Sequence, residues 1–596
     1  MRVLHLQPSS NRSDAIYCSF TIHKVKACNS SYKAVSHVWY PKGISQERVT
    51  IQIADGDHIY PLEIRPNQER ALRQIRHPSH KVCLWIDALC INQKDMEEKA
   101  HQNKMMPFIF QSASEVIVWL GDGDDDTEKA MKFIPQLIDL TDFDRLLKSE
   151  ETPAQWQALV KLLENPYFSR RWVFLEVILA RRAVVHCGAH SVLWDEFCDA
   201  VLLLGSRFED IQFLCKRFAL TQDTGNRLEE LADLRALSAY SVAEASRDLF
   251  RPLSAGLTSS LCTLGTLVSF LPGLQTRDPR DVIWALLPVA SDAVVTGIHM
   301  DFDMHASTLY QQFARYCADT TNTIDIICTP WAAKLKDSIS FLQPYPPLPS
   351  WICSVDKLPF GRRKKDLYGR KNGDVLVGRP NRTFYNAAQN SIAVPVFGTT
   401  SELGHTILDG TMIVSGFQLG TISELGNRAA AGTLHSEWVD MSGWQPGDKV
   451  VPDMLWRTLV ADRGPDGTRT PPWYHRACLY WLDAFEGEDV TYDVLQHKRH
   501  PSSAVQYMQR VQTVIWNRKL FVFANRSGVR VFGLAPQEAK LHDSIAILHG
   551  CSVPVILRQD EKGWRLIGEC FVYGNMDGEA MKDEENKKHT QEFLLY

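Results

Sequence analysis

The sequence lacks the short motifs that bind nucleotides or carry a catalytic serine in common enzyme classes. No G-x-G-x-x-G follows a predicted strand, and neither G-x-x-x-x-G-K-[S/T] nor G-x-S-x-G occurs. These absences leave a dinucleotide-dependent dehydrogenase, a P-loop NTPase and an α/β-hydrolase without support. We therefore expect no bound cofactor.

Metal-binding patterns are also missing. The chain has 14 cysteines, but no two of them form a C-x-x-C pair, which argues against a zinc ribbon and a thioredoxin-like site. The acidic segment Gly121–Glu128 is similar to a calcium loop, yet Thr127 stands where the sixth position needs Gly and Phe133 where the twelfth needs Glu. We expect a solvated turn there, at the start of a helix, and no metal site.

Targeting segments and charge runs are scarce. The N-terminus has no apolar stretch of the kind that a secretory signal needs, and the uncharged segment 252–276 is interrupted by Ser, Thr and Gly, which predicts a buried core helix rather than a membrane span. The formal net charge is −5, and the one basic cluster, 362–365, is short. The protein is therefore expected in the cytoplasm, with no nucleic acid or membrane as a partner.

The length of 596 residues predicts several compact units rather than one core. Changes in pattern along the chain divide it into five parts. We expect an α/β domain over 1–204, a helical region over 205–345, a mixed irregular region over 346–505, a small β-rich domain of barrel or sandwich type over 506–580, and a loose charged tail over 581–596.

Short apolar runs alternate with helical patterns in the first part, which favours a mostly parallel sheet covered by helices. One helix is predicted to begin after Asp95, with Glu98 completing a capping box, and Pro107 should kink or split it. The predicted strands are Tyr32–Trp39, Lys81–Ile91, Glu115–Leu120 and Ala183–Cys187.

Two carboxylates lie within apolar segments, where an unpaired charge is costly to bury. On a helix, Glu176 is surrounded by apolar neighbours. It is either a structural group paired with a backbone donor or with an arginine such as Arg170 or Arg181, or a cleft carboxylate with a raised pKa.

Asp87 lies near the end of a predicted central strand, where open α/β sheets place groups that bind ligands. Asn92 follows in the exit loop. The alternative is that Asp87 and Asn92 hold this loop through hydrogen bonds to backbone amides. His37 and His186, near other strand ends, are more typical of hydrogen-bonded structural histidines than of ligands.

Three segments resemble, in order, the motifs of the fungal heterokaryon incompatibility (HET) domain. YKAVSHVW at 32–39 is similar to the first motif, LWIDALCINQ at 84–93 is a near-verbatim match to the second, and RWVFLEVILA at 171–180 resembles the third. Two departures are His37, which replaces an aromatic residue, and Leu175, which replaces the Gln before Glu176.

The resemblance extends downstream of these motifs. DPRDVIWALL at 278–287 and LPSWI at 348–352 are similar to segments that follow HET domains, and the end of the chain resembles the β-rich end of many such proteins.

HET domains are regarded as distant relatives of Toll-receptor-like (TIR) domains, so the resemblance implies a flavodoxin-like α/β fold. Many TIR domains cleave NAD with a helix Glu preceded by a Trp, and Trp172 and Glu176 match that pattern. The resemblance thus implies a cell-death effector of fungal non-self recognition that cleaves NAD with Glu176 as the catalytic residue. The substrate-binding residues would be Ser36, His37, Trp39, Asp87, Asn92 and Trp172, with Trp39 or Trp172 stacking on nicotinamide.

The alternative is a non-enzymatic signalling module that self-associates or recruits protein partners. In that interpretation, Glu176 and Asp87 are purely structural. In both, the middle and C-terminal regions regulate the first domain or recognise a signal.

Overall fold

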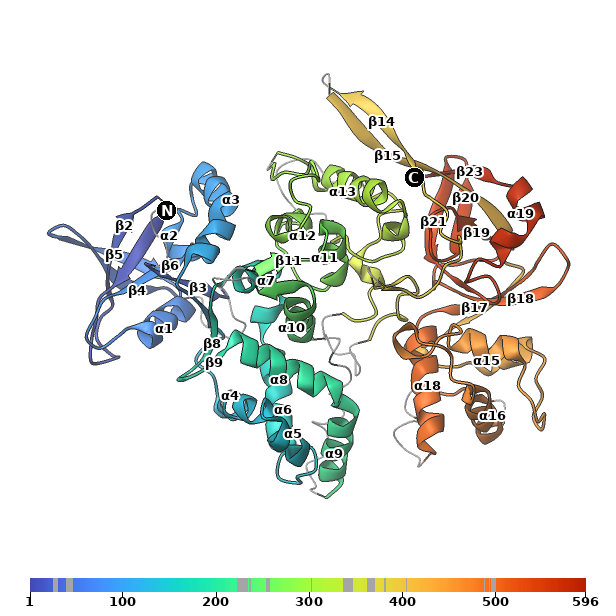
Figure 1. The fold of residues 1–596 in the computed structure, drawn as a ribbon, viewed down its shortest axis with the longest axis horizontal. Helices are drawn as coiled ribbons and strands as arrows, with labels where there is room; N and C mark the ends of the chain where they lie inside the picture. The colour runs from blue at the N-terminus through green and yellow to red at the C-terminus, as the bar shows by residue number, and fades with distance from the viewer. Residues whose placement is uncertain are drawn as a thin grey trace. The chain divides into compact units, whose positions relative to one another are not determined.

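The computed structural model describes residues 1–24, 31–38, 47–221, 234, 237–252, 258–301, 303–335, 347–361, 370–379, 382–402, 405–486, 488–491, 494 and 500–596. The chain divides into two compact units (Figure 1), which are 1–267 with 273–302, and 268–272 with 303–596. The first unit thus continues well past residue 204, and the helical region predicted over 205–345 is shared between the two units.

A nine-stranded mixed sheet organises the first unit. Its spatial order is β5-β4-β2-β1-β6-β3-β7-β8-β9. The strands are β1 (Arg2–Leu6), β2 (Tyr17–Ile22), β3 (Lys33–His37), β4 (Val49–Asp55), β5 (His58–Ile64), β6 (Val82–Ile86), β7 (Glu115–Trp119), β8 (Ala183–Cys187) and β9 (His190–Leu193).

The four predicted strands form the centre of this sheet. β6, β3, β7 and β8 are neighbours and run parallel, and their Val- and Ile-rich sequences are buried as expected for strands covered on both faces. β1 joins β6 in the antiparallel direction, and β9 joins β8 likewise. The sheet is therefore mixed, with a parallel centre and antiparallel additions that the sequence did not predict.

Helices connect and cover the strands. Asp95 caps α3, because its side chain accepts a hydrogen bond from the Glu98 amide (3.0 Å). The helices of the first unit are α1 (Pro66–Ile75), α2 (Asp87–Cys90), α3 (Met96–Ser112), α4 (Asp125–Leu137), α5 (Leu140–Leu146), α6 (Pro153–Leu163), the 3-10 turn η2 (Pro166–Ser169), α7 (Arg171–Ile178), α8 (Trp194–Ser206), α9 (Phe208–Thr221), α10 (Ser238–Asp248) and α12 (Asp281–Trp284).

Three local predictions need correction. The apolar run 81–91 is not one strand, because α2 begins at Asp87 directly after β6. Pro107 does not split α3, which is one helix of 17 residues. The segment 252–276 is not one buried helix: its helical part is α11 (Leu264–Phe270), preceded by the short pair β10 (Phe250–Pro252) and β11 (Thr258–Ser260). β11 begins at Thr258, and β-branched residues favour extended structure.

A closed five-stranded barrel dominates the second unit. β15 (His405–Thr421) pairs with both β19 (Ser544–Leu548) and β23 (Gln591–Leu595). β19, β20 (Val555–Asp560), β21 (Gly563–Glu569) and β23 complete the ring. Its core includes Phe417, Ile545, Ile547 and Ile556. The β-rich end was predicted, but β15 and β23 lie in regions expected to be irregular and loose.

The residues after 581 are not a loose tail. They form α19 (Glu584–Lys588) and β23, and Phe593 and Leu595 of β23 are fully buried. A buried apolar residue at every second position outweighs the charges around it.

The remaining elements of the second unit lie beside the barrel (Figure 1). They are α13 (Ala306–Thr321), β12 (Gly378–Arg379), β13 (Arg382–Thr383), β14 (Val396–Glu402), β16 (Glu424–Arg428), α14 (Ser436–Met441), α15 (Asp453–Leu459), α16 (Tyr474–Phe485), α18 (Ser502–Ile515), β17 (Lys519–Ala524), β18 (Arg530–Ala535) and β22 (Phe571–Val572). In the parts of the chain that the structure describes, no helix has the length and apolarity needed to cross a bilayer.

Candidate functional site

The Glu176 carboxyl group lies inside the first unit, on α7. Its residue is 3% exposed, and its Oε2 accepts a hydrogen bond from the Ser36 hydroxyl of β3. Ser36 is the residue before the last of its strand and is itself buried. The structure therefore joins two predicted site residues that are 140 positions apart.

Tyr167 extends this contact into a chain of three side chains. Its hydroxyl lies 2.7 Å from Ser36 Oγ. When Glu176 is ionised, Ser36 donates its one proton to the carboxylate, and Tyr167 is then the donor to Ser36. Tyr167 comes from η2 and is fully buried. Tyr167 could not be identified from the sequence, because a Tyr in the short turn before α7 carries no signal of its own.

The two arginines considered as partners of Glu176 donate hydrogen bonds to backbone carbonyl groups. The Arg170 guanidinium donates to the His37 carbonyl, and its positive charge acts on Glu176 from close by. Arg181 instead donates to the Gln111 carbonyl (3.0 Å). The first of the two candidate arginines thus influences the carboxyl group, while Ser36 provides its hydrogen bond.

Burial raises the pKa of Glu176 to about 7, and the negative charge of Asp87 contributes to the increase. Arg170 and the Ser36 hydrogen bond oppose the change. The group therefore ionises close to neutral pH, a property shared by carboxyl groups that act in acid–base or charge-stabilising roles.

His37 ends β3 and Asp87 directly follows β6, and Asp87 is close enough for its charge to act on the Glu176 carboxyl group. His37 Nδ1 is 3.9 Å from Asp87 Oδ1, and Nε2 is 3.3 Å from the side-chain nitrogen of Gln68 on α1. Burial lowers the pKa of His37, with Arg170 adding to the decrease and Asp87 opposing it, so the ring is neutral at pH 7. The Asp87 side chain keeps 17% of its surface exposed and is the more accessible carboxylate.

Two asparagines occupy the point where the strand order reverses, between β3 and β7. Asn67 of α1 donates to the Val38 carbonyl (2.7 Å) and accepts from Trp119 Nε1 (3.1 Å). Asn165 donates to the Leu120 carbonyl (3.0 Å). These side chains hold the ends of both strands, at the place where open α/β sheets bind ligands.

In the described part of the chain, no hydrogen bond or ion pair joins Asn92 or Trp172 to the Glu176 carboxyl group. Asn92 is exposed in the exit loop, where its side-chain oxygen accepts from the Lys94 amide (3.2 Å). Trp172 hydrogen-bonds Asp281. Trp39 lies outside the described residues.

The segments around Gln275 and Asp281 form hydrogen bonds with the start of α7 and fix its position. Arg171, fully buried, donates to the Val282 carbonyl (2.8 Å), and its amide donates to the Gln275 carbonyl (3.0 Å). Burial raises the pKa of Asp281 to about 7, while the Trp172 hydrogen bond opposes the increase. The segment 278–287 is therefore part of the framework that positions Glu176.

The acidic segment after β7 acts as a helix start. Asp124 caps α4 by accepting from the Thr127 amide (2.8 Å). Lys161 donates to both Asp124 (3.0 Å) and Asp126 (2.8 Å). The Thr127 amide, with help from Lys161, lowers the pKa of Asp124 to about 2.

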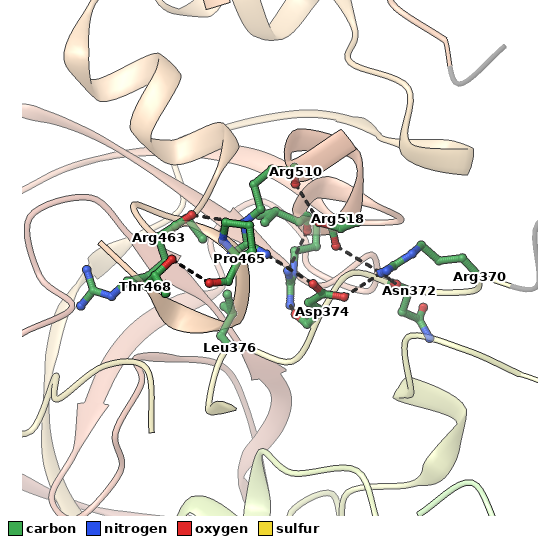
Figure 2. Close-up of polar contacts among 12 residues, drawn as sticks. Arg370, Asn372, Asp374, Leu376, Arg463, Pro465, Thr468, Arg510 and Arg518 are labelled. Atoms are coloured by element: carbon green, nitrogen blue, oxygen red, sulfur yellow. Dashed lines mark hydrogen bonds and ion pairs between the residues drawn. The ribbon is translucent and has the colours of Figure 1, made fainter. Parts of the chain in front are cut away.

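A second polar cluster lies in the other unit. Figure 2 shows Arg370, Arg510 and Arg518 around Asp374. The carboxylate of Asp374 accepts from Arg370 (2.8 Å) and Arg510 (3.3 Å), and its carbonyl accepts from Arg518 (2.7 Å). Arg518 also pairs with the partly buried Glu569 (2.9 Å). Because these charged groups pair with one another, we interpret the cluster as a structural contact that joins segment 370–377, α18 and β21. We call it the arginine latch.

Comparison with known proteins places the first site within a recognised domain. Residues 32–176 match the family described as heterokaryon incompatibility protein (HET). The chain is also similar to "Heterokaryon incompatibility protein 6, OR allele" of Neurospora crassa, with 24% identity over 98% of this chain and 95% of the relative. No solved structure matches the chain. Ser36, His37, Asp87, Tyr167 and Glu176 all fall inside the matched residues.

Proposed function

We propose that the protein, whose residues 32–176 match the HET family, acts in heterokaryon incompatibility, as a cell-death effector of fungal non-self recognition. The observation that carries this proposal is the similarity to a heterokaryon incompatibility protein along 98% of the chain, well beyond the HET domain itself. The second unit then supplies regulation or recognition of the signal.

For the chemistry, we propose hydrolysis of NAD at the bond between nicotinamide and ribose. The bond from ribose C1′ to the nicotinamide nitrogen breaks, and the electron pair stays with nicotinamide. Water adds to C1′ and releases a proton, so that NAD and water yield nicotinamide and ADP-ribose. The ionised Glu176 would accept hydrogen bonds from ribose hydroxyls and stabilise the positive charge that develops on the ring.

The raised pKa of Glu176 and its position beside Asp87 and Arg170 support this proposal. Substrate would have to replace the hydrogen bond that Ser36 now donates to the carboxyl group. His37 and Asp87, at the strand ends, are the proposed contacts to the rest of the nucleotide. Of the two tryptophans proposed to stack on nicotinamide, Trp172 is engaged by Asp281, which leaves this role to Trp39.

A second candidate function is favoured by the burial of Glu176. A carboxyl group that is 3% exposed and already hydrogen-bonded also suits a structural role. In this alternative the HET domain signals by self-association or by recruiting partners and cleaves nothing.

Expression in fungal cells would separate the two functions. Glu176→Gln keeps the shape and hydrogen-bonding capacity of the side chain but removes its charge. Glu115→Gln is the matched control. Glu115 lies at the amino end of β7, whereas the candidate site lies at the carboxyl ends of the strands, and it pairs with Lys33 and Arg182. The readouts are cell viability and cellular NAD content.

We expect wild type and Glu115→Gln to kill cells and deplete NAD, and Glu176→Gln to do neither. Killing by Glu176→Gln at the wild-type level, with NAD unchanged, would establish the non-enzymatic function instead. Full viability of cells that express wild type, also after fusion with an incompatible strain, would contradict the incompatibility function itself.

A further inference from the structure

An apolar patch lies on the outside of the sheet in the second unit. Val396 of β14 is directly across from Ile413 of β15, and Ile413 is across from Leu594 of β23. Residues directly opposite in neighbouring strands place their side chains on the same face. Val396 is 58% exposed and Leu594 is 37% exposed. The next cross-strand pair, Met412 and Leu595, is buried and marks the inner face.

The segment before β14 extends this surface. Ile392, Val394 and Val396 are exposed, whereas Ala393 between the first two is buried. Alternation of this kind places every second side chain on one face of the segment. We call the surface formed by Ile392, Val394, Val396, Ile413 and Leu594 the outer patch.

The outer patch stands out from the other apolar groups on this unit. After residue 303, eight large apolar residues are exposed in the described part of the chain. Four of them belong to the outer patch: Ile392, Val394, Val396 and Leu594. The other four lie singly on separate loops, turns or helix starts: Val450, Trp473, Val529 and Leu541. Scattered apolar residues are normal on a protein surface, whereas contiguous ones mark contact surfaces.

The features of the patch favour a second copy of the same chain over a partner with a different surface. Residues 391–401 contain no charged side chain, so two copies can bring these segments together without opposing like charges. Among the described residues β14 pairs with β15 alone and is an edge strand, and natural edge strands are usually protected by charges. The other exposed large apolar residues described on this unit are single, so the apolar area available to face the patch is the patch of a second copy.

We propose that two copies of this chain associate through the outer patch about a two-fold axis. The five residues form the apolar centre of the interface. Glu592, which precedes Leu594 by two residues on the same face of β23, lies at its polar rim. This association does not depend on whether the HET domain cleaves NAD.

Sedimentation velocity of the purified full chain tests the proposal. The variants are Val394→Glu and Val396→Glu, which place a charge on residues that are 80% and 58% exposed, so the fold has little reason to change. The matched control is Val529→Glu, a residue 57% exposed in the turn between β17 and β18. Circular dichroism checks that all three variants are folded.

We expect wild type and Val529→Glu to form dimers at about 10 µM, and each patch variant to weaken dimerisation by at least about tenfold. Wild type that stays monomeric up to about 100 µM would overturn the proposal and leave the patch to a different partner. Association that Val394→Glu and Val396→Glu leave unchanged would also overturn it.

Discussion

At the residue scale, Glu176 couples the stability of the first unit to pH. Its pKa is raised from 4.5 to about 7 in the folded protein, so the folded state binds the proton more tightly than the unfolded chain. The stability that this group contributes is therefore complete below about pH 4.5 and is lost as pH rises through 7.

Glu176→Gln should remove this dependence. We expect its unfolding temperature, relative to wild type, to increase between pH 5 and pH 8, by the equivalent of up to about 3 kcal/mol. Asp281, whose pKa is also about 7, titrates in both proteins and cancels in the difference. Thermal unfolding at four pH values measures the effect, and a difference that is constant with pH would show that Glu176 does not titrate there.

Arg170 should set the ionised fraction of Glu176. Its positive charge lowers the pKa of this carboxyl group, so Arg170→Gln raises the pKa further and reduces the carboxylate present at pH 7. Infrared difference spectra of the protonated carboxyl band, with Glu176→Gln as the blank, follow the titration. Arg181→Gln is the control, because Arg181 donates to the Gln111 carbonyl. A lower pKa in Arg170→Gln would contradict this geometry.

Much of the site at this scale could be predicted from single positions. Glu176 and Asp87 stood out because a charge inside an apolar run needs an explanation, and the fold brings them close enough for one to raise the pKa of the other. Ser36 and His37 came from the family resemblance. Tyr167 and Asn67 could not be found this way, because their roles depend on contacts with residues 131 and 52 positions away.

At the element scale, predictions succeeded where one pattern dominated a segment. β7 and β8 are short, apolar and rich in Val, and both begin at the predicted residue. α2 was missed because its apolar sequence continues that of β6, and periodicity cannot separate such short runs. β15 and β23 were missed because Gly and charged residues interrupt them, while their partners in the barrel decide the strand conformation.

The arginine latch of the second unit predicts a large effect from one carboxylate. Arg370 and Arg510 are 6% and 10% exposed and both pair with Asp374. Asp374→Asn leaves these buried cations facing a neutral amide, and we expect a loss of about 3 kcal/mol. Urea unfolding followed by the fluorescence of tryptophans in this unit measures it.

Asp577→Asn is the matched control for the latch. Asp577 pairs with Arg463 but is 46% exposed, so its loss should cost about 1 kcal/mol or less. Equal costs for the two variants would mean that Asp374 is no more important to the fold than a surface ion pair.

At the scale of the whole molecule, the division into units differs from the one that composition suggested. Length alone predicted several units, but the framework of the first unit includes the segment 278–284, which contacts α7 through Arg171 and Trp172. A contact across about a hundred residues leaves no mark in local composition. The resemblance of 278–287 to segments that follow HET domains was the sequence signal that could have extended the first unit.

The proposed incompatibility function also belongs to the whole chain. Similarity to the Neurospora crassa protein extends over 98% of this chain and therefore covers both units. The proposed chemistry, in contrast, depends on one carboxyl group in the first unit.

The central chemical claim is tested most directly by nicotinamide release from NAD, using the purified full chain at pH 7.5 in the form found to be death-competent in the cell assay. We expect release by wild type and by Glu115→Gln, and a loss of at least about 100-fold in kcat for Glu176→Gln. Absence of release by wild type in that form, or equal release by wild type and Glu176→Gln, would contradict the claim.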